Sequence, residues 1–263
     1  MSLALGMNPT RLMGLVVAAL TVPALAQDAE ALLRDADRYR TGADNLQVDT
    51  LVQAYASDGT LDKERRYTVF AQADRRTLVL MQSAAEKGQK VLMLGDDFWL
   101  LMPSSQRPMR ITPMQKLLGD ASTGDIATMR WSGDYSATLV GVEPCVDTTA
   151  PAVPGVQIPP PASCYHLQLQ ATRKGVTYQR IGLWLGQQRH EPVRALLYVQ
   201  SDKLAKQALF EVDKALSSVS AMVLIDQLGK QKQTRIRYLA RKERTVPVEW
   251  LNPMFLARSP VLE

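Results

Sequence analysis

Histidine is nearly missing from this sequence, with only His166 and His190 in 263 residues. Neither histidine belongs to an HExxH pattern, the chain has no GxSxG pattern, and no Cys–His pair is placed to act as nucleophile and base. No Gly-rich loop of the kind that holds phosphate precedes a helix. These absences argue against metal-dependent and nucleophilic catalysis. The sequence therefore predicts a protein that is not an enzyme and has neither a cofactor nor a metal site.

A strong excess of one charge is also missing, because 31 Lys and Arg stand against 26 Asp and Glu. The one clustered basic run, RIRYLARKER, alternates with apolar residues, as an exposed strand face does. A mild and scattered basic excess is typical of a solvated surface. We therefore expect no nucleic-acid partner.

Long apolar runs are absent except near the N-terminus. There, Arg11 precedes an apolar run from Leu12 to Val22, and the small-residue pattern Ala24-Leu25-Ala26 stands before Gln27. This arrangement is typical of a secretory signal peptide, and its apolar run is about half of the ~20 residues that a membrane-spanning helix needs. An uncleaved anchor is the alternative. We expect residues 1–26 to be removed and residues 27–263 to form one exported domain.

Cysteine is as scarce as histidine, and both copies, Cys145 and Cys164, follow the predicted signal peptide. No cysteine lies at the predicted cleavage point, so the chain shows no sign of being lipidated itself. In an oxidising compartment an even pair at this spacing predicts a disulfide. The Pro-rich stretch VDTTAPAVPGVQIPPPAS between them would then be a stiff loop that is clamped at its base.

The periodicity of the chain predicts a mostly β (α+β) fold. The stretch DAEALLRDADRYRT has apolar residues at helical spacing, and from Leu46 onward the apolar period changes to two. About a dozen alternating runs follow, separated by short turns and without a long helical block. Short connections favour antiparallel pairing, and a sheet of this size has to curl.

One segment, residues 113–129, interrupts the strands. It combines a short helical start with a loop of Gly, Ser, Thr and Asp. A long irregular segment in a compact domain is often functional. We predict a lid across an open end of the sheet, with apolar contacts from Leu117, Leu118, Ile126 and Met129.

The stretch KVLMLGDDFWLLMP is apolar on both alternating faces. Its Gly95-Asp96-Asp97 has the composition of a tight turn or bulge. The apolar residues around the turn fit either a central strand that is covered on both faces or the wall of an apolar cavity. We predict the cavity wall, with five bulky residues on strands or beside the lid. These are Met93, Trp99, Leu101, Trp131 and Trp184.

Several stretches together resemble the outer-membrane lipoprotein-sorting proteins of the LolA-like superfamily. They are GDDFWLLMPSSQRPMRIT, KLLGDASTGDIATMRWSGDYSATLVG, CYHLQLQA, VTYQRIGLWL and VPVEWLNPMFL, and they extend over nearly all of residues 27–263. The resemblance implies an unclosed, strongly curved antiparallel half-barrel, with covering helices and an apolar cavity for acyl chains. The long Cys145–Cys164 loop departs from the better-known carriers, which indicates a paralogous branch.

The resemblance implies a periplasmic carrier that binds the acyl chains of a lipoprotein or another lipid and moves them toward the outer membrane. Its partner would be an inner-membrane transporter, of either the resistance-nodulation-division (RND) or the lipoprotein-releasing type. Two alternatives stay open at this point. One is an accessory protein of an RND-type exporter of a hydrophobic compound, and the other is a hydrolase of unfamiliar architecture.

Overall fold

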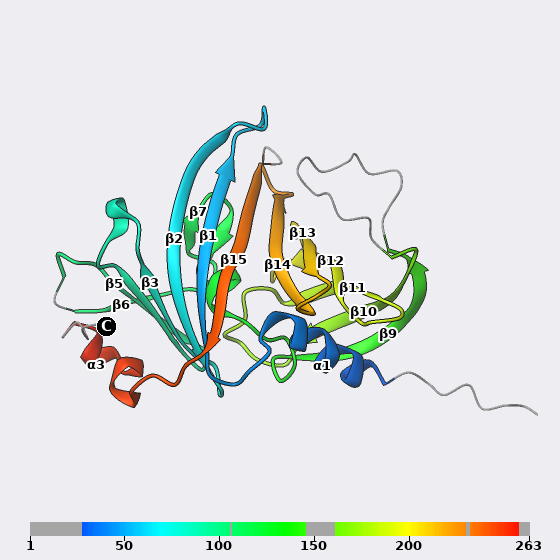
Figure 1. Cartoon of the computed structure of the whole chain (residues 1–263), viewed down its shortest axis with the longest axis horizontal. Helices are drawn as coiled ribbons and strands as arrows, with labels where there is room; N and C mark the ends of the chain where they lie inside the picture. The colour runs from blue at the N-terminus through cyan, green and yellow to red at the C-terminus, as the bar shows by residue number, and fades with distance from the viewer. Residues whose placement is uncertain (1–27, 106, 146–160, 230–231, 258–263) are drawn as a thin grey trace, which may run out of the picture.

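The computed structural model describes residues 28–105, 107–145, 161–229 and 232–257 (Figure 1). The predicted signal peptide and most of the Pro-rich loop lie outside these residues. Within them, no helix is long and apolar enough to cross a membrane.

Thirteen antiparallel strands form one sheet, in the order β6-β5-β4-β3-β2-β1-β15-β14-β13-β12-β11-β10-β9. The order is linear, so β6 and β9 stay at opposite edges and the sheet does not close. The predicted open, curved half-barrel is confirmed. The strands are β1 (Leu46–Tyr55), β2 (Leu61–Gln72), β3 (Arg76–Met81), β4 (Lys90–Leu94), β5 (Asp97–Leu101), β6 (Met109–Ile111), β9 (Tyr135–Pro144), β10 (Ser163–Ala171), β11 (Arg180–Gly186), β12 (Pro192–Tyr198), β13 (Leu204–Asp213), β14 (Ser218–Asp226) and β15 (Gln233–Glu243).

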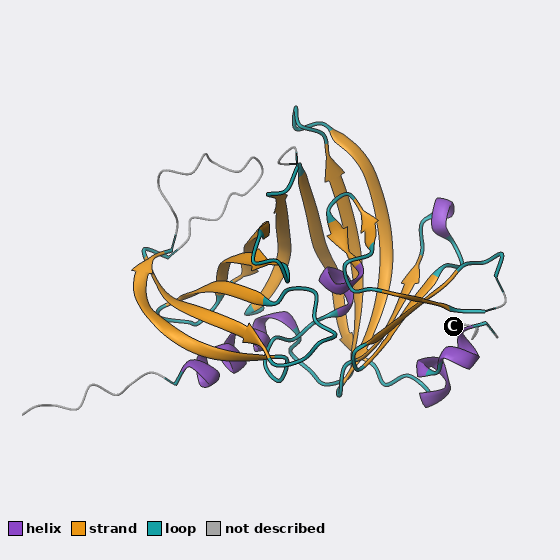
Figure 2. Ribbon diagram, turned by 180° about the vertical axis from the view of Figure 1, so that it is seen from behind, coloured by secondary structure: helices purple, strands orange, loops and turns teal. Residues whose placement is uncertain are grey.

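This strand order fixes the path of the segment that interrupts the strands. The chain runs outward from β1 to the edge strand β6, and it resumes at the opposite edge with β9 before returning to pair β15 with β1. Residues 112–134, here called the crossing segment, join the two edges. They contain β7 (Lys116–Leu118), β8 (Ala121–Ser122) and the short helix α2 (Thr123–Ala127). Figure 2 shows these elements lying in front of the curved sheet.

Helix α1 (Ala29–Arg40) begins at Asp28, whose side chain accepts a hydrogen bond from the Glu30 amide, and two arginines lie in its last turn. Both features stabilise a helix of this length. Its apolar stripe, Leu32, Leu33 and Ala36, is buried on the same face of the sheet as α2. We call this the inner face, because both helices and the largest apolar core lie on it.

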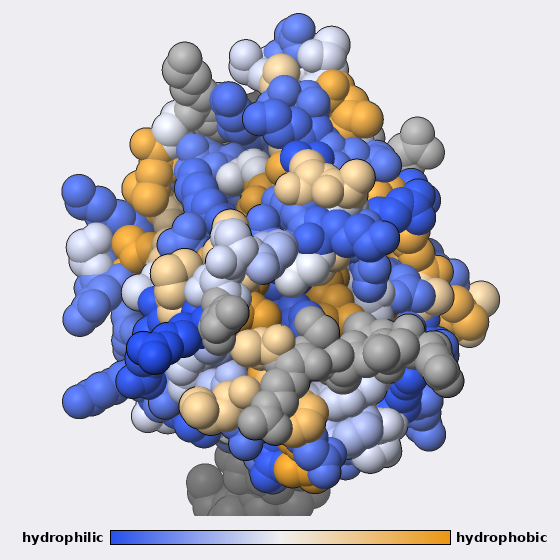
Figure 3. Space-filling view, turned by 90° about the vertical axis from the view of Figure 1, so that its left-hand side faces the viewer, coloured by the Kyte–Doolittle hydropathy of each residue, from blue (hydrophilic) through white to orange (hydrophobic). Residues whose placement is uncertain are grey.

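The outer face is covered at one end by the C-terminal segment. The 3-10 helix η2 (Val248–Leu251) and α3 (Pro253–Leu256) pack on β2–β5 through Leu251 and Leu256. A second 3-10 helix, η1 (Ala84–Glu86), connects β3 and β4. Figure 3 shows this end of the molecule, where apolar groups are scattered among polar ones.

Candidate ligand-binding site

The inner face of the sheet carries the main apolar core. Side chains from both arms of the sheet, β1–β5 and β9–β15, meet there. The fully buried members include Val48, Val79, Val91, Leu167, Leu169, Leu183, Leu185, Leu224 and Ile236. A curved apolar surface of this extent has to be covered by chain or by ligand.

The crossing segment provides that cover. Leu118, Ile126, Met129 and Trp131 are each less than 9% exposed and belong to the inner core, and Leu117 packs against it while half-buried. The four residues predicted as lid contacts are therefore brought together on the inner face. Met93 lies in the same core.

Two glycines of the crossing segment, Gly119 and Gly124, are close-contact points. A Cβ added to Gly119 would lie 2.5 Å from Thr234 Oγ1, and one added to Gly124 would lie 1.8 Å from Thr177 Oγ1. Gly119 also has a φ of +54°, which favours glycine. Gly119 thus lets the backbone of the segment approach β1 and β15, and Gly124 lets it approach the loop between β10 and β11.

A buried ion pair fastens α2 to the sheet. Lys206 Nζ of β13 donates to Asp125 Oδ2 at 2.6 Å, and both side chains are almost fully buried. Tyr178 Oη donates to Asp125 Oδ1 at 2.8 Å, and burial keeps the pKa of Tyr178 well above its ordinary value. Ser122 completes a capping box with Asp125 at the start of α2. The crossing segment therefore meets the apolar face through a carboxylate.

A second polar contact fastens α1 to the crossing segment. Asp37 accepts hydrogen bonds from the amides of Trp131 and Ser132 and from the Ser132 hydroxyl. Arg40 stacks over the Trp131 ring at 3.8 Å and donates to the Thr128 carbonyl at 3.0 Å. Burial raises the pKa of Asp37 and lowers that of Arg40, in spite of their mutual attraction.

A cavity of about 260 Å³ opens where the crossing segment meets the β2–β3 turn and the end of α1. One wall is apolar and the other is charged, so the cavity is amphipathic. The apolar wall contains Leu46, Ala71, Met93, Ala127 and Met129, and the charged wall contains Asp44, Asp74, Arg75, Arg130, Asp134 and Arg173.

The charges of this cavity are largely paired. Arg75 contacts Asp134 and donates to the carbonyls of Gly95 and Gly175 at 2.9 and 3.0 Å, and Arg130 contacts Asp44. Burial, and then the charge of Arg173, lower the pKa of Arg75. The cavity therefore has a polar rim of roughly balanced charge above apolar residues.

Beneath the crossing segment, the inner face leaves little free space. A crevice lined by Trp131, Phe210 and Met222, among others, has a volume of about 40 Å³. One water molecule occupies ~30 Å³ in the liquid. Over the described residues, side chains of the protein itself therefore fill the inner face beneath the crossing segment.

Two of the five predicted wall residues, Trp99 and Leu101, lie on the opposite face from Met93 and Trp131. They pack in the outer cluster under the C-terminal helices. The prediction treated Met93 and Trp99 as sharing one face, but Gly95-Asp96 is a two-residue hairpin turn that pairs Met93 with Phe98. Because of this turn, odd-numbered residues face inward before it and even-numbered residues face inward after it. Phe98 and Leu100 therefore face inward.

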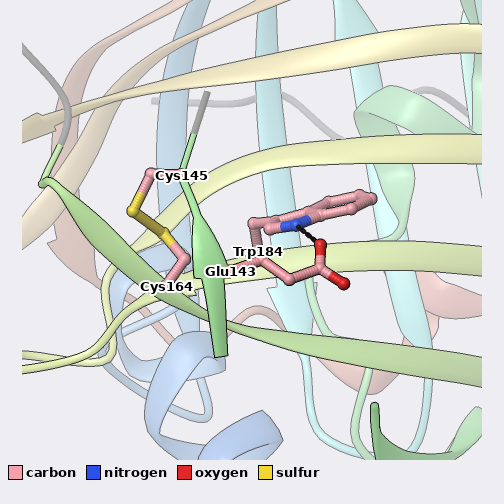
Figure 4. The surroundings of a disulfide bond; sticks show 4 residues. All are labelled: Glu143, Cys145, Cys164 and Trp184. Carbon is pink, nitrogen blue, oxygen red and sulfur yellow. Dashed lines mark hydrogen bonds between the residues drawn. A yellow bond between two sulfur atoms is a disulfide. The ribbon is translucent and has the colours of Figure 1, made fainter. Parts of the chain in front are cut away.

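Trp184 also lies apart from the inner core. In β11 it points outward between His166, which stacks on the indole at 4.0 Å, and Arg194, which lies 3.7 Å from its centroid. Its Nε1 donates to Glu143 at 3.1 Å (Figure 4). Cys145 and Cys164 form a disulfide beside it, as the sequence indicated. The five predicted residues therefore do not form one wall.

Several residues of this site went unnoticed in the sequence, although it contained a signal for them. Lys206, Ala208 and Phe210 alternate along β13 and so lie on the same face of the strand. Ala208 and Phe210 face inward. Asp37 and Arg40 continue the apolar stripe of α1 at helical spacing from Leu33. A charge at an apolar position is the pattern that would have identified both contacts.

Comparison with known proteins identifies relatives over most of the chain. A family model described as "Uncharacterized protein" matches residues 73–258, whereas the search of curated proteins found no match. The solved structures include a LolA superfamily protein from Nitrosomonas europaea, with a TM-score of 0.73 and 29% identity, over 86% of this chain and 98% of that one.

Two further structures share the fold at lower identity. A DUF1329 family protein from Desulfovibrio piger has a TM-score of 0.65 and 18% identity, over 86% of this chain and 97% of that one. A domain from Vibrio parahaemolyticus, provisionally assigned to outer membrane lipoprotein sorting, has a TM-score of 0.64 and 14% identity, over 88% of this chain and 98% of that one. Together these structures confirm the resemblance seen in the sequence motifs.

Proposed function

Because the chain belongs to the family whose model matches residues 73–258 and is similar to LolA superfamily structures, we propose that it is a carrier of acyl chains. In this proposal residues 27–263 form one carrier domain, which is exported to the periplasm. It binds the acyl chains of a lipoprotein or another lipid, performs no catalysis, and moves its cargo toward the outer membrane. Its partner would be an inner-membrane transporter of the RND or lipoprotein-releasing type.

The observation that carries this proposal is the polar fastening of the crossing segment on an apolar face. A permanent plug would be expected to meet the inner face through apolar side chains alone. Instead, Asp125 is paired with Lys206 in the core, and a buried pair of this kind contributes little net stability because both charges lose their hydration. The arrangement gives a specific closed position that can be left at moderate cost.

Loading would require the crossing segment to move. The crevice of about 40 Å³ beneath it cannot hold an acyl chain, whereas the apolar surface that Ile126, Met129 and Trp131 cover is extensive. Acyl chains would replace these side chains on the inner face. The loss of apolar contacts on opening would be offset by new contacts with the ligand, at roughly 25 cal/mol per Å² buried.

The amphipathic cavity of about 260 Å³ is the proposed entrance. Its apolar wall includes Met93 and Met129, which belong to the inner core, and its charged rim faces outward. Methionine side chains adapt to ligands of different shape. A lipid would keep its polar part at this rim while its chains pass beneath Ala127–Met129.

A reversible cross-link tests the proposal. In the Gly124→Cys, Thr177→Cys variant the two Cβ atoms would lie near 3.0 Å apart, close to the ~3.5 to 4.5 Å of disulfides. The oxidised form should fail to bind an uncharged pyrene-labelled diacylglycerol, and mild reduction should restore binding. The native disulfide is fully buried and should survive that reduction.

The reduced form of the same variant is the matched control, because its sequence is identical. Equal probe binding by the oxidised and reduced forms would show that lipid does not enter beneath the crossing segment, and the carrier proposal would then fail.

Mass spectrometry of lipids extracted from the native protein would identify the cargo class.

A further inference from the structure

A groove of about 430 Å³ lies between the end of α1, the β13–β14 turn and the end of β15. In Figure 1 this is near the bottom of the molecule, where α1 lies beside the lower part of β14 and β15. Residues Thr41, Ala43 and Leu46 line both this groove and the amphipathic cavity, so they separate the two spaces. The groove has no part in the carrier proposal.

Two exposed leucines flank the groove. Leu216 is 74% exposed in the β13–β14 turn, where Asp213 accepts hydrogen bonds from the Ala215 and Leu216 amides and Ser217 has a φ of +47°. Leu239 is 43% exposed at a bulge, because β1 pairs with Tyr238 and Ala240 and passes over it. The turn at Leu216 and the bulge at Leu239 each direct an apolar side chain toward solvent. Contact with a ligand would remove this apolar surface from water.

The groove carries a net positive charge, because Arg241 and Lys242 outnumber Glu243 among its lining residues, while Arg38 pairs with Asp35. Arg241 Nη2 donates to the Val219 carbonyl, and its guanidinium lies 4.7 Å from the Tyr238 ring centroid. Among the described residues, neither Arg241 nor Lys242 has an ion-pair partner within 4 Å. Burial, and the nearby charge of Arg40, lower the pKa of Arg241. An anion in the groove would stabilise the charged guanidinium of Arg241 by direct attraction.

Size and shape favour a small ligand. A volume of about 430 Å³ lies within the range of ~300 to 1,000 Å³ that is usual for small-molecule sites. A flat membrane surface could touch Leu216 but could not enter a concave groove. Apolar rims beside a cation match a molecule with an anionic head and a hydrocarbon chain.

We propose that this groove binds an anionic amphiphile. Its carboxylate or phosphate lies against Arg241, and its alkyl chain lies between Leu216 and Leu239. The groove shares no lining residue with the crevice beneath the crossing segment, so that the protein has one site for a charged lipid and another for acyl chains.

Isothermal titration calorimetry with octyl phosphate, below its micelle-forming concentration, tests the site. Octyl phosphate should bind, whereas inorganic phosphate and octyl glucoside should bind at least tenfold more weakly, because each lacks one half of the ligand. Arg241→Met keeps an apolar stem without the charge, and should weaken binding at least tenfold. Leu216→Ser should weaken it severalfold.

Arg237→Met is the matched control, since Arg237 is exposed on the same strand but does not line the groove. It should bind like the parent. Leu216 lies in an exposed turn, so Leu216→Ser should still fold. This variant therefore tests the site even if Arg241→Met fails to fold. Octyl phosphate should also bind the oxidised Gly124→Cys, Thr177→Cys variant, so loss of the carrier proposal would leave this one intact.

Three results would overturn the proposal. Parent-like binding by both Arg241→Met and Leu216→Ser would place the ligand elsewhere. Equal affinity for inorganic and octyl phosphate would indicate a simple phosphate site. Binding to phosphatidylglycerol vesicles without any binding of octyl phosphate would indicate contact with a membrane surface.

Discussion

At the scale of single residues, the site depends on charges in apolar surroundings. Asp125 and Lys206 are 8% and 5% exposed, and each is the other's ion-pair partner. Removing one member of a buried pair leaves an uncompensated charge, whereas removing both can be neutral or stabilising. The closed state should therefore respond differently to single and double substitutions.

We expect Lys206→Met to lower the free energy of unfolding by about 3 to 5 kcal/mol, because Asp125 would remain buried with only hydrogen bonds. The Lys206→Met, Asp125→Leu double variant should recover much of this loss, less about 1 kcal/mol for the hydrogen bonds that Asp125 accepts from Ser122. Urea denaturation measures both values. Lys203→Met, at an exposed position before β13, is the control. If the double variant is as unstable as Lys206→Met, the ion pair is not the source of the effect.

Asp37 predicts a pH dependence. Burial raises the pKa of Asp37 above its ordinary value of 3.8, so the folded chain binds this proton more tightly than the unfolded chain. The contribution of Asp37 to stability is therefore present in full below pH ~4 and declines as pH rises through the folded pKa. The difference in unfolding free energy between the parent and Asp37→Asn should shrink from pH 4 to 7. Urea denaturation at several pH values measures this difference, and a constant value would contradict the assigned direction.

At the scale of elements, the β4–β5 hairpin shows how far the sequence determined the site. Its composition predicted apolar residues on both faces and a turn at Gly95, and both are present. The composition did not decide whether that turn was a bulge within one strand or a hairpin between two strands. The face on which Trp99 and Leu101 lie depends on which of the two it is. When both faces of a strand are apolar, alternation alone cannot indicate which face is the inner one.

The crossing segment was predicted from its break in periodicity, and its place on the inner face follows from strand order. Its fastening was not predicted, because Asp125 and Lys206 are 81 residues apart and pair only once β13 is in place. Gly119 and Gly124 belong to the loop that was predicted as part of a lid, and in the structure they allow close approach to neighbouring residues. Long-range pairs of this kind cannot be read from local composition.

The two faces of the hairpin should differ in function. Met93→Ala and Trp99→Ala should both destabilise the protein, and Met93→Ala should do so by about 2 to 5 kcal/mol because Met93 is only 2% exposed. Binding of the diacylglycerol probe should weaken for Met93→Ala only, since Trp99 lies on the outer face with Arg110 over its ring. Probe titration of folded protein measures this. Weaker binding by Trp99→Ala alone would place the site on the outer face.

At the scale of the whole molecule, the two arms of the sheet are joined by the β1–β15 pairing and by the crossing segment. The disulfide lies away from that junction, near the edge strand β9 and on the outer side with Trp184. Stability and ligand binding should therefore be separable at this position. The disulfide closes a loop between cysteines 19 residues apart, which stabilises the fold by about 3 kcal/mol in the chain-entropy account.

We accordingly expect Cys145→Ser, Cys164→Ser to lower the free energy of unfolding by about 3 kcal/mol, with the buried Trp184 losing part of its packing. Binding of the diacylglycerol probe by the folded variant should match the parent, because the inner face and the crossing segment keep all their contacts. Urea denaturation and probe titration on the same preparation measure the two quantities. If the folded variant lost probe binding, the edge of the sheet at β9 would be coupled to the inner face. Loading would then involve more than movement of the crossing segment.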